Sequence, residues 1–510
     1  MSAPHSAPYF VGIDSGLSVT KSAVWDAEGQ CLAVAAVPSR HEMLPDGLVE
    51  TDPEEQWRAA ARATRTAVRE AGVAAAVAAV GVSSHGDCVY LVDDSGTPVR
   101  PAIPSLDFRG AQIARGWRRT GVSRRFFEIT GELPHPHHIH ATLAWLRDHE
   151  PESLAAARWV LFAKDWLKLR LTDTVTTDPT DATAGFMDLR AGGYSDDALA
   201  VCGLSALRAK LPPILPSATT VGALTEEAAE STGLAPGTPV AGGVHDISAA
   251  ALGCGLADAG TALLIAGTYS VNVVLSDRPH PDERWLCREW ALPGRWLHMS
   301  TSATSASNLS WLLDQLGPGQ GGDDSQFAAM EAEVANVLDE DPAPVFHPFL
   351  YGIPGDERAS AALLGLRPWH RRAHIYRAVL EGIAFSHRMH LEALADCAPV
   401  TRVLLAGGAT RSTLWSQLFA DALGLPVEVK AVAEHGSLGA AMCAAAATGA
   451  MPSLEHGVAK MTPPGRTYLP ADDRRDHWEH ACRRYAESVR AAPAMWTALS
   501  GPPSEPRSSR

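Results

Sequence analysis

The sequence predicts an α/β protein of two domains, and three observations lead to this prediction. The chain has 510 residues, more than one hydrophobic core usually serves. Short apolar runs typical of strands alternate with helical segments along it. A pattern of strand, small polar turn and strand occurs twice, about half a chain apart, around residues 14–16 and around 267–268. The repeat indicates a duplicated domain, each copy with a central mixed sheet flanked by helices.

The first half is expected to begin with an antiparallel meander followed by a helix. The fragment Thr51-Asp52-Pro53-Glu54-Glu55 places a capping residue, a proline and two acids in the order typical of a helix start. The elements expected in this half are strands over 9–13, 19–25, 32–37, 77–82 and 89–92 and a helix from about 51 to 70.

The second half repeats the meander and adds a glycine turn. Strands are expected over 261–266 and 270–275, separated by Gly267-Thr268. A strand over 402–406 is followed by Gly407-Gly408 and by a helix that Ser412 caps, a geometry common at nucleotide contacts. Small turn residues let backbone N–H groups approach an anion. The pattern alone leaves phosphate loops and ordinary hairpins equally open.

Composition and charge limit the binding partners and the cellular compartment that can be expected for this chain. A net charge of −15 argues against nucleic acid or an anionic membrane as the main partner. The first residues lack a signal-peptide pattern, and no apolar run approaches the roughly 18 residues of a membrane span. The eight cysteines are scattered without a C-x-x-C pair. We therefore expect a reduced cytoplasmic protein with neither disulfides nor a zinc site.

One acid stands in an otherwise small and apolar stretch. Residues 241–255 read AGGVHDISAAALGCG, and Asp246 is their only carboxylate. A buried carboxylate is costly without a partner. Asp246 therefore either caps the helix that begins near Ile247 or takes part in the chemistry.

Five stretches in order resemble the FGGY carbohydrate kinases, over about residues 10–449. They are GIDSGLSVTK at 12–21, WVLFAKDWLKLRLT at 159–172 with TDPTDAT at 177–183, Gly267-Thr268, RAVLEGIAF at 377–385 and LAGGATRSTLWSQ at 405–417. The resemblance implies two actin-like ATPase (ribonuclease H-like) domains with a central cleft. It implies a sugar-binding domain over 1–254, an ATP-binding domain over 255–450 and helices over 451–500 that pack back on the second domain. Residues 501–510 are Pro-rich and are expected to be disordered.

The resemblance also assigns roles to individual residues. Asp246 matches the general base that takes a proton from the sugar hydroxyl. Asp14 would hold Mg²⁺, directly or through water. The residues expected to bind ATP are Gly16, Ser18 and Lys21 in the first phosphate loop, Gly267 and Thr268 in the second, and Asn308, Gly408, Ala409 and Ser412 near the adenosine.

The expected substrate is a small ketose or polyol, similar to xylulose. His85, Asp87 and Asp107 are candidate substrate ligands together with Asp246. Asp87 stands where many D-xylulose kinases carry a histidine, and Ser105-Leu106-Asp107 replaces their Trp-Asn-Asp. The GLSVTK loop at 16–21 and Ser-Leu-Asp-x-Arg at 105–109 are more similar to the L-xylulose, keto-gulonate or erythritol branches. Asp87 disfavours a carboxylated sugar unless a cationic side chain offsets its charge.

Three further points stay open from the sequence. The histidines in PHPHHIH at 134–140 suit either a zinc or nickel site or, as we favour, a contact with the substrate. Another actin-like ATPase and a catalytically silent sugar and ATP sensor are the alternative functions. A homodimer is also left open.

Overall fold

Two short stretches from the second half of the chain pack with its first half. The computed structural model describes residues 8–316, 324–353, 356 and 358–499. The first unit comprises Met1–Ala257, Ser276–His298 and Ala431–Pro464, and the second comprises Asp258–Leu275, Met299–Lys430 and Gly465–Arg510. The domain ranges 1–254, 255–450 and 451–500 follow the family pattern rather than these units, and they stay predictions. The tail at 501–510 lies outside the described residues.

The first unit is built on a mixed sheet whose central strand is β1. Its order is β3-β2-β1-β6-β10-β9, and β11 also pairs with β6. The pairs β1–β2, β2–β3 and β10–β9 are antiparallel, whereas β1–β6 and β6–β10 are parallel. The strands are β1 (Tyr9–Ser15), β2 (Val19–Trp25), β3 (Cys31–Pro38), β6 (Val77–Ser84), β9 (Thr220–Ala223), β10 (Pro239–Ala241) and β11 (Val244–His245).

The second sheet repeats the pairing pattern around the central strand, which agrees with the duplication that the sequence predicts, and it has one more strand at the β14 edge. Its order is β14-β15-β13-β12-β18-β19-β20. Here β12 pairs antiparallel with β13 and parallel with β18, and β18–β19 is parallel while β19–β20 is antiparallel. The strands are β12 (Thr261–Ala266), β13 (Ser270–Ser276), β14 (Leu286–Glu289), β15 (Trp296–Ser302), β18 (Arg402–Ala406), β19 (Val427–Lys430) and β20 (Gly465–Tyr468).

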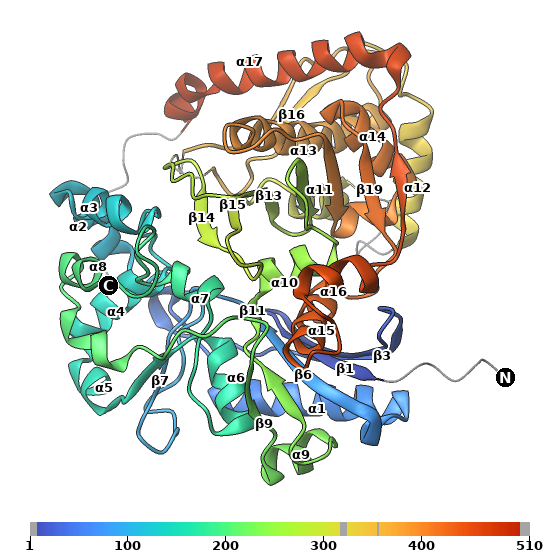
Figure 1. Cartoon of the computed structure of the whole chain (residues 1–510). Helices are drawn as coiled ribbons and strands as arrows, with labels where there is room; N and C mark the ends of the chain where they lie inside the picture. The colour runs from blue at the N-terminus through green and yellow to red at the C-terminus, as the bar shows by residue number, and fades with distance from the viewer. Residues whose placement is uncertain (1–7, 317–323, 354–355, 357, 500–510) are drawn as a thin grey trace. The chain divides into compact units, whose positions relative to one another are not determined.

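Helices cover both faces of the first sheet (Figure 1). Helix α1 (Pro53–Ala71) packs on one face, where Thr64 donates a hydrogen bond to Ser22. Helix α15 (His435–Ala447) packs on the other face. A Cβ atom at Gly12 would lie 1.8 Å from the carbonyl oxygen of Ser437, so the strand and α15 are in backbone contact. The alanine-rich sequence of α15 permits this tight packing.

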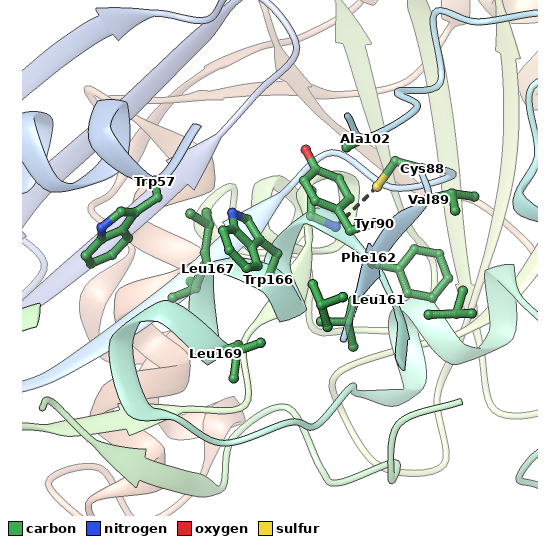
Figure 2. Close-up of a cluster of buried hydrophobic side chains, with 14 of the residues drawn as sticks. Trp57, Cys88, Val89, Tyr90, Ala102, Leu161, Phe162, Trp166, Leu167 and Leu169 are labelled. Atoms are coloured by element: carbon green, nitrogen blue, oxygen red, sulfur yellow. Dashed lines mark hydrogen bonds between the residues drawn. The ribbon is translucent and has the colours of Figure 1, made fainter. Parts of the chain in front are cut away.

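The remaining elements extend the two units. Figure 2 shows part of the hydrophobic core of the first unit, including Trp166. Trp166 lies on α6 (Ala163–Thr172) and donates its indole N–H to the carbonyl oxygen of Pro53 at 2.9 Å. The helices not yet named in the first unit are α2 (Ala111–Thr120), α3 (Val122–Thr130), α4 (Ile139–His149), α5 (Pro151–Ala156), α7 (Pro179–Ala184), α8 (Asp196–Val201), α9 (Glu226–Thr232), α10 (Asp246–Gly253) and α16 (Leu454–Met461). Those in the second unit are α11 (Ala306–Leu316), α12 (Asp324–Ala335), α13 (Arg372–Leu394), α14 (Thr413–Leu423) and α17 (Arg475–Leu499).

The predicted strands and the two predicted caps agree closely with the structure. The helix expected from about 51 begins at Pro53, capped by Asp52, and Ser412 caps α14 by accepting a hydrogen bond from the N–H of Trp415. All eight cysteines are free thiols. Among the described residues, no helix is long and apolar enough to cross a membrane.

Candidate active site

Asp246 begins helix α10, directly after the short strand β11. Strand β11 runs parallel to the end of β6, with His245 opposite Ser84. The capping residue of α10 is His245, so Asp246 lies in the first turn rather than at the cap. The N–H of Ile247 donates to Asp246 Oδ1 at 2.7 Å. The side chain of Asp246 remains 35% exposed, which leaves it accessible to a small molecule.

The surroundings of Asp246 bring its pKa close to neutral pH. Burial raises the pKa of Asp246 to about 7, and the charges of Asp14 and Asp87 act in the same direction. The N–H of Ile247 and the guanidinium of Arg288 oppose this rise. A carboxylate with a pKa near the working pH is suited to accept a proton from a substrate.

Asp14 lies at the end of β1, on the same face of the sheet as Gly12. It pairs in register with Lys21 on β2 and with Ser83 on β6. Ser83 donates its hydroxyl to Asp14 Oδ1 at 3.0 Å. A Cβ atom on Gly436 would lie 2.2 Å from Asp14 Oδ2, so only a glycine fits at this point in the first turn of α15.

The charge state of Asp14 bears on cation binding. Burial raises the pKa of Asp14, while Ser83 and Lys21 partly offset the effect. The charge of Asp14 also raises the pKa of Asp246, so the two carboxylates lie close enough to repel each other. Such a pair is relieved by a bound cation.

The first predicted phosphate loop connects β1 to β2. Ser18 is exposed in this turn, and Gly16 donates its N–H to the carbonyl oxygen of Val19 at 3.1 Å. Lys21 is ion-paired with Glu434, the capping residue of α15, at 2.8 Å. If Lys21 contacts a phosphate, its ammonium group therefore interacts with both the phosphate and Glu434. The roles of Gly16, Ser18 and Lys21 in ATP binding stay predictions.

Asp87 takes part in a buried ion-pair network. Arg288 lies on β14 and is 3% exposed; its Nη2 is 3.2 Å from Asp87 Oδ2, and its Nε is 2.8 Å from Glu132 Oε1. Burial alone would raise the pKa of Asp87, but the charge of Arg288 holds it below its ordinary value. Burial raises the pKa of Glu132, against the opposing effect of Arg288. Asp87 is thus an ionised acceptor beside a fixed guanidinium.

The other two candidate substrate ligands have different surroundings. Both oxygens of Asp107 are occupied within the protein, because the N–H of Val49 donates to Oδ2 at 2.7 Å and Arg109 Nε donates to Oδ1 at 2.8 Å. His85 is buried, its Nδ1 is 3.1 Å from the carbonyl oxygen of Ser15, and burial lowers its pKa to about 4. Contacts of Asp107 and His85 with the substrate stay predictions, and the geometry favours a structural role for Asp107.

The histidine cluster packs beside the Asp87 network as neutral rings. The rings of His137 and His138 have centroids 4.8 Å apart, and those of His135 and His138 are 4.9 Å apart. Burial lowers the pKa of all four histidines, to about 4 for His135 and His140. Among the described residues, no group of three or more His, Cys, Asp and Glu side chains could hold a metal ion. The zinc or nickel interpretation therefore has no support.

A second buried charge cluster, around Lys164, lies next to the backbone of His245. Lys164 Nζ lies 2.8 Å from Asp165, 3.0 Å from Asp178 and 3.2 Å from Asp181. Thr180 donates to Asp178 at 2.8 Å and accepts a hydrogen bond from the backbone N–H of His245 at 2.9 Å. The stretch at 159–183, which carried part of the family resemblance, thus positions the residue before Asp246.

The predicted ATP residues of the second unit lie in its turns and helix starts. Gly267, Thr268 and Tyr269 join β12 to β13, and the side chain of Thr268 is exposed. Asn308 is fully buried, donating to the carbonyl oxygen of Ala303 at 2.9 Å. Gly408 and Ala409 form a 3-10 turn before α14, and Ser412 caps that helix. Their contacts with ATP stay predictions.

Sequence reasoning missed Arg288, Glu132 and His245 as parts of one network. Arg288 and Glu132 lie 156 residues apart. The sequence around one ionisable residue does not indicate which distant residue it pairs with. His245 could have been noticed, because it immediately precedes the only acid of its stretch. The glycine at 436 was equally inconspicuous in an alanine-rich helix.

Comparison with known proteins gives matches along almost the whole chain. Residues 9–253 match the model of the N-terminal domain of the FGGY family of carbohydrate kinases, and residues 262–448 match that of its C-terminal domain. The L-xylulose/3-keto-L-gulonate kinase of Escherichia coli (strain K12) is 28% identical, covering 95% of this chain and 97% of the relative. The erythritol kinase of Brucella abortus (strain 2308) is 30% identical, covering 96% and 97%. The crystal structure of xylulose kinase from Rhodospirillum rubrum has a TM-score of 0.88 and 28% identity, covering 96% and 100%.

Proposed function

Since the chain belongs to the FGGY family of carbohydrate kinases, we propose that Asp246 is the general base for phosphorylation of a small neutral ketose or polyol. Membership confirms the resemblance, the two actin-like α/β domains and the activity of an ATP-dependent sugar kinase. The observation that carries the assignment of the base is the partly exposed carboxylate of Asp246, whose pKa burial raises to about 7.

The proton transfer follows from the chemistry of the acceptor. A sugar hydroxyl is a weak nucleophile until its proton has somewhere to go, and a positioned base contributes about 10²–10⁴-fold to the rate. Asp246 takes that proton as the hydroxyl oxygen bonds to the γ-phosphorus of ATP and the bond from phosphorus to the β–γ bridging oxygen breaks. Gly16, Ser18, Lys21, Gly267 and Thr268 hold the phosphates, while Asn308, Gly408, Ala409 and Ser412 line the adenosine.

Asp14 fits a magnesium site of the type found beside nucleotides. Magnesium is commonly held by one or two carboxylates together with phosphates and water, so a single protein carboxylate suffices. Asp14 Oδ2 is the carboxylate oxygen beside the glycine of α15. The ion, when bound, neutralises negative charge that develops on the phosphates. Asp14 is then the residue that positions it.

The network around Arg288 favours a neutral substrate. A guanidinium has five N–H donors, and a carboxylate is best recognised by two of them at once. The Nε donor of Arg288 faces Glu132, its Nη2 faces Glu132 and Asp87, and its Nη1 faces His245. Little capacity remains for a substrate carboxylate, while ionised Asp87 can accept from a hydroxyl. The guanidinium therefore offsets the charge of Asp87 without forming a carboxylate site.

Three predictions from the sequence concern the setting of the reaction. We propose a cytoplasmic location, a small-molecule sugar as the main partner and no role for nucleic acid. Light scattering with multi-angle detection measures whether the chain is a monomer or the homodimer that the sequence left open.

The test is sugar-dependent release of ADP. Purified protein with ATP and Mg²⁺ is screened over pentuloses, hexuloses, tetritols, pentitols and aldonates, alongside Asp246→Asn. We expect turnover on a neutral ketose or polyol and a loss of about 10²–10⁴-fold in the variant, with its melting temperature retained. Near-normal turnover of Asp246→Asn would refute the assignment of the base. Preference for an aldonate would refute the neutral substrate.

A further inference from the structure

We infer that His245 is a positioning residue that donates a hydrogen bond from Nδ1 to Asp246 Oδ1, in a ring orientation that Arg288 fixes. The inference rests on the proposed function, because it assigns the proton transfer to the other oxygen, Asp246 Oδ2. It links the base to the Asp87 network through one imidazole.

The contacts of the His245 ring carry the inference. Nδ1 lies 3.1 Å from Asp246 Oδ1, and the side chain of His245 is 5% exposed. Nε2 lies 3.4 Å from Arg288 Nη1. A single imidazole therefore lies between the guanidinium and the carboxylate.

The ring is held in this place from two sides. A Cβ atom on Gly86 would lie 2.3 Å from His245 Nε2, so the backbone of residue 86 lies directly against the ring. The backbone N–H of His245 donates to Thr180, which is itself anchored on Asp178. Both ends of the residue are thus fixed by buried neighbours.

The tautomer follows from the donors around the ring. Arginine has donors but no acceptor, so Nε2 beside Arg288 has to be the acceptor and the ring proton is on Nδ1. The N–H of Ile247 is the competitor for Nδ1, at 3.3 Å. Its contact with Asp246 Oδ1 is shorter, at 2.7 Å. The N–H of Ile247 is therefore used by Asp246, and Nδ1–H is free to donate.

The arrangement divides the two oxygens of Asp246 between two tasks. Oδ1 accepts from Ile247 N–H and from His245 Nδ1–H, which orients the carboxylate. Oδ2 is left for the substrate hydroxyl. Burial and the charge of Arg288 lower the pKa of His245 to about 3, so the ring stays neutral and does not take the proton. The charged or titratable groups that act on this ring are Arg288, Asp87, Lys164, His85 and Asp246.

A pair of amide substitutions tests the inference. The amide nitrogen of His245→Asn can occupy the position of Nδ1, whereas that of His245→Gln reaches toward Nε2 and leaves Oδ1 without this donor. We expect His245→Asn to keep kcat within about threefold, and His245→Gln to lose about tenfold or more. Loss of the hydrogen bond from residue 245 also raises the pKa of Asp246, because the bond stabilises the ionised carboxylate. The acid limb of kcat/KM therefore moves upward by about one pH unit in His245→Gln only.

Two controls separate this inference from the proposed function. Equal losses in both His245 variants without movement of the acid limb would overturn the positioning role, and Asp246→Asn would still report on the base. Retained activity in Asp246→Asn would overturn both. Should either His245 variant fail to fold, ¹⁵N spectra of the wild-type imidazole decide. A proton on Nδ1 is expected, and a proton on Nε2 would overturn the inference.

Discussion

The two sheets share the pairing pattern of their central strands but differ at the tips of their central hairpins. In the first unit, β1 ends with Asp14 paired to Lys21 on one side and Ser83 on the other. In the second unit, β12 ends with Ala266 paired to Ser270, followed by Gly267-Thr268. The first tip therefore carries Asp14 beside Lys21, whereas the second carries Gly267, Thr268 and the exposed Tyr269, without an acidic or basic side chain. The duplicated fold therefore carries a candidate magnesium ligand at only one of its two hairpin tips.

The largest contrast is expected between substitutions at the two tips. Asp14→Asn should lower kcat by about 10²-fold or more, because it removes the carboxylate that would position magnesium. Thr268→Val should leave kcat within about threefold and raise KM for ATP less than about tenfold, since a neutral hydroxyl makes only a modest contact. Steady-state kinetics with varied ATP and Mg²⁺ measure both. A larger loss of kcat in Thr268→Val than in Asp14→Asn would reverse the comparison.

The tip of the first sheet also depends on close backbone packing. Gly12→Ala should destabilise the protein by about 3 kcal/mol, because its Cβ would collide with the carbonyl oxygen of Ser437. The control is Gly116→Ala in α2, where a Cβ meets nothing within 4 Å. This control should be stabilising by about 0.5–1 kcal/mol, as alanine favours a helix over glycine. Urea unfolding measures the free energy of unfolding of both variants. Equal values would show that the contact of Gly12 with Ser437 does not restrict the side chain at position 12.

A smaller effect is expected on substrate choice. Asp87→Asn removes the charge of one of the two carboxyl groups that face Arg288 Nη2, the other being that of Glu132. The ratio of kcat/KM for an aldonate to that for a neutral ketose should then rise about tenfold. The matched control is Asp197→Asn in the exposed first turn of α8, for which the ratio should not change. An unchanged ratio in Asp87→Asn would show that Arg288 does not set the preference for neutral substrates.

Much of the fold was predictable because it is encoded locally. Apolar runs and turn residues located the strands of both meanders, and the cap at Ser412 was found from residue type alone. Asp14 and Asp246 were found through motifs. The pairing of Arg288 with Asp87 and Glu132 could not be predicted, because it joins segments far apart in sequence. The same holds for the return of 431–464 to the first unit, which brings Glu434 to Lys21 and Gly436 to Asp14.

The pH dependence of kcat/KM tests the central claim most directly. The free enzyme's kcat/KM reports the pKa of its essential base. Because Asp246 has a raised pKa of about 7 and acts when ionised, kcat/KM should fall about tenfold per unit as the pH drops below about 7. The residual activity of Asp246→Asn should lack this limb. A wild-type profile that stays flat from about pH 5.5 to 8, or the same limb in Asp246→Asn, would contradict the account.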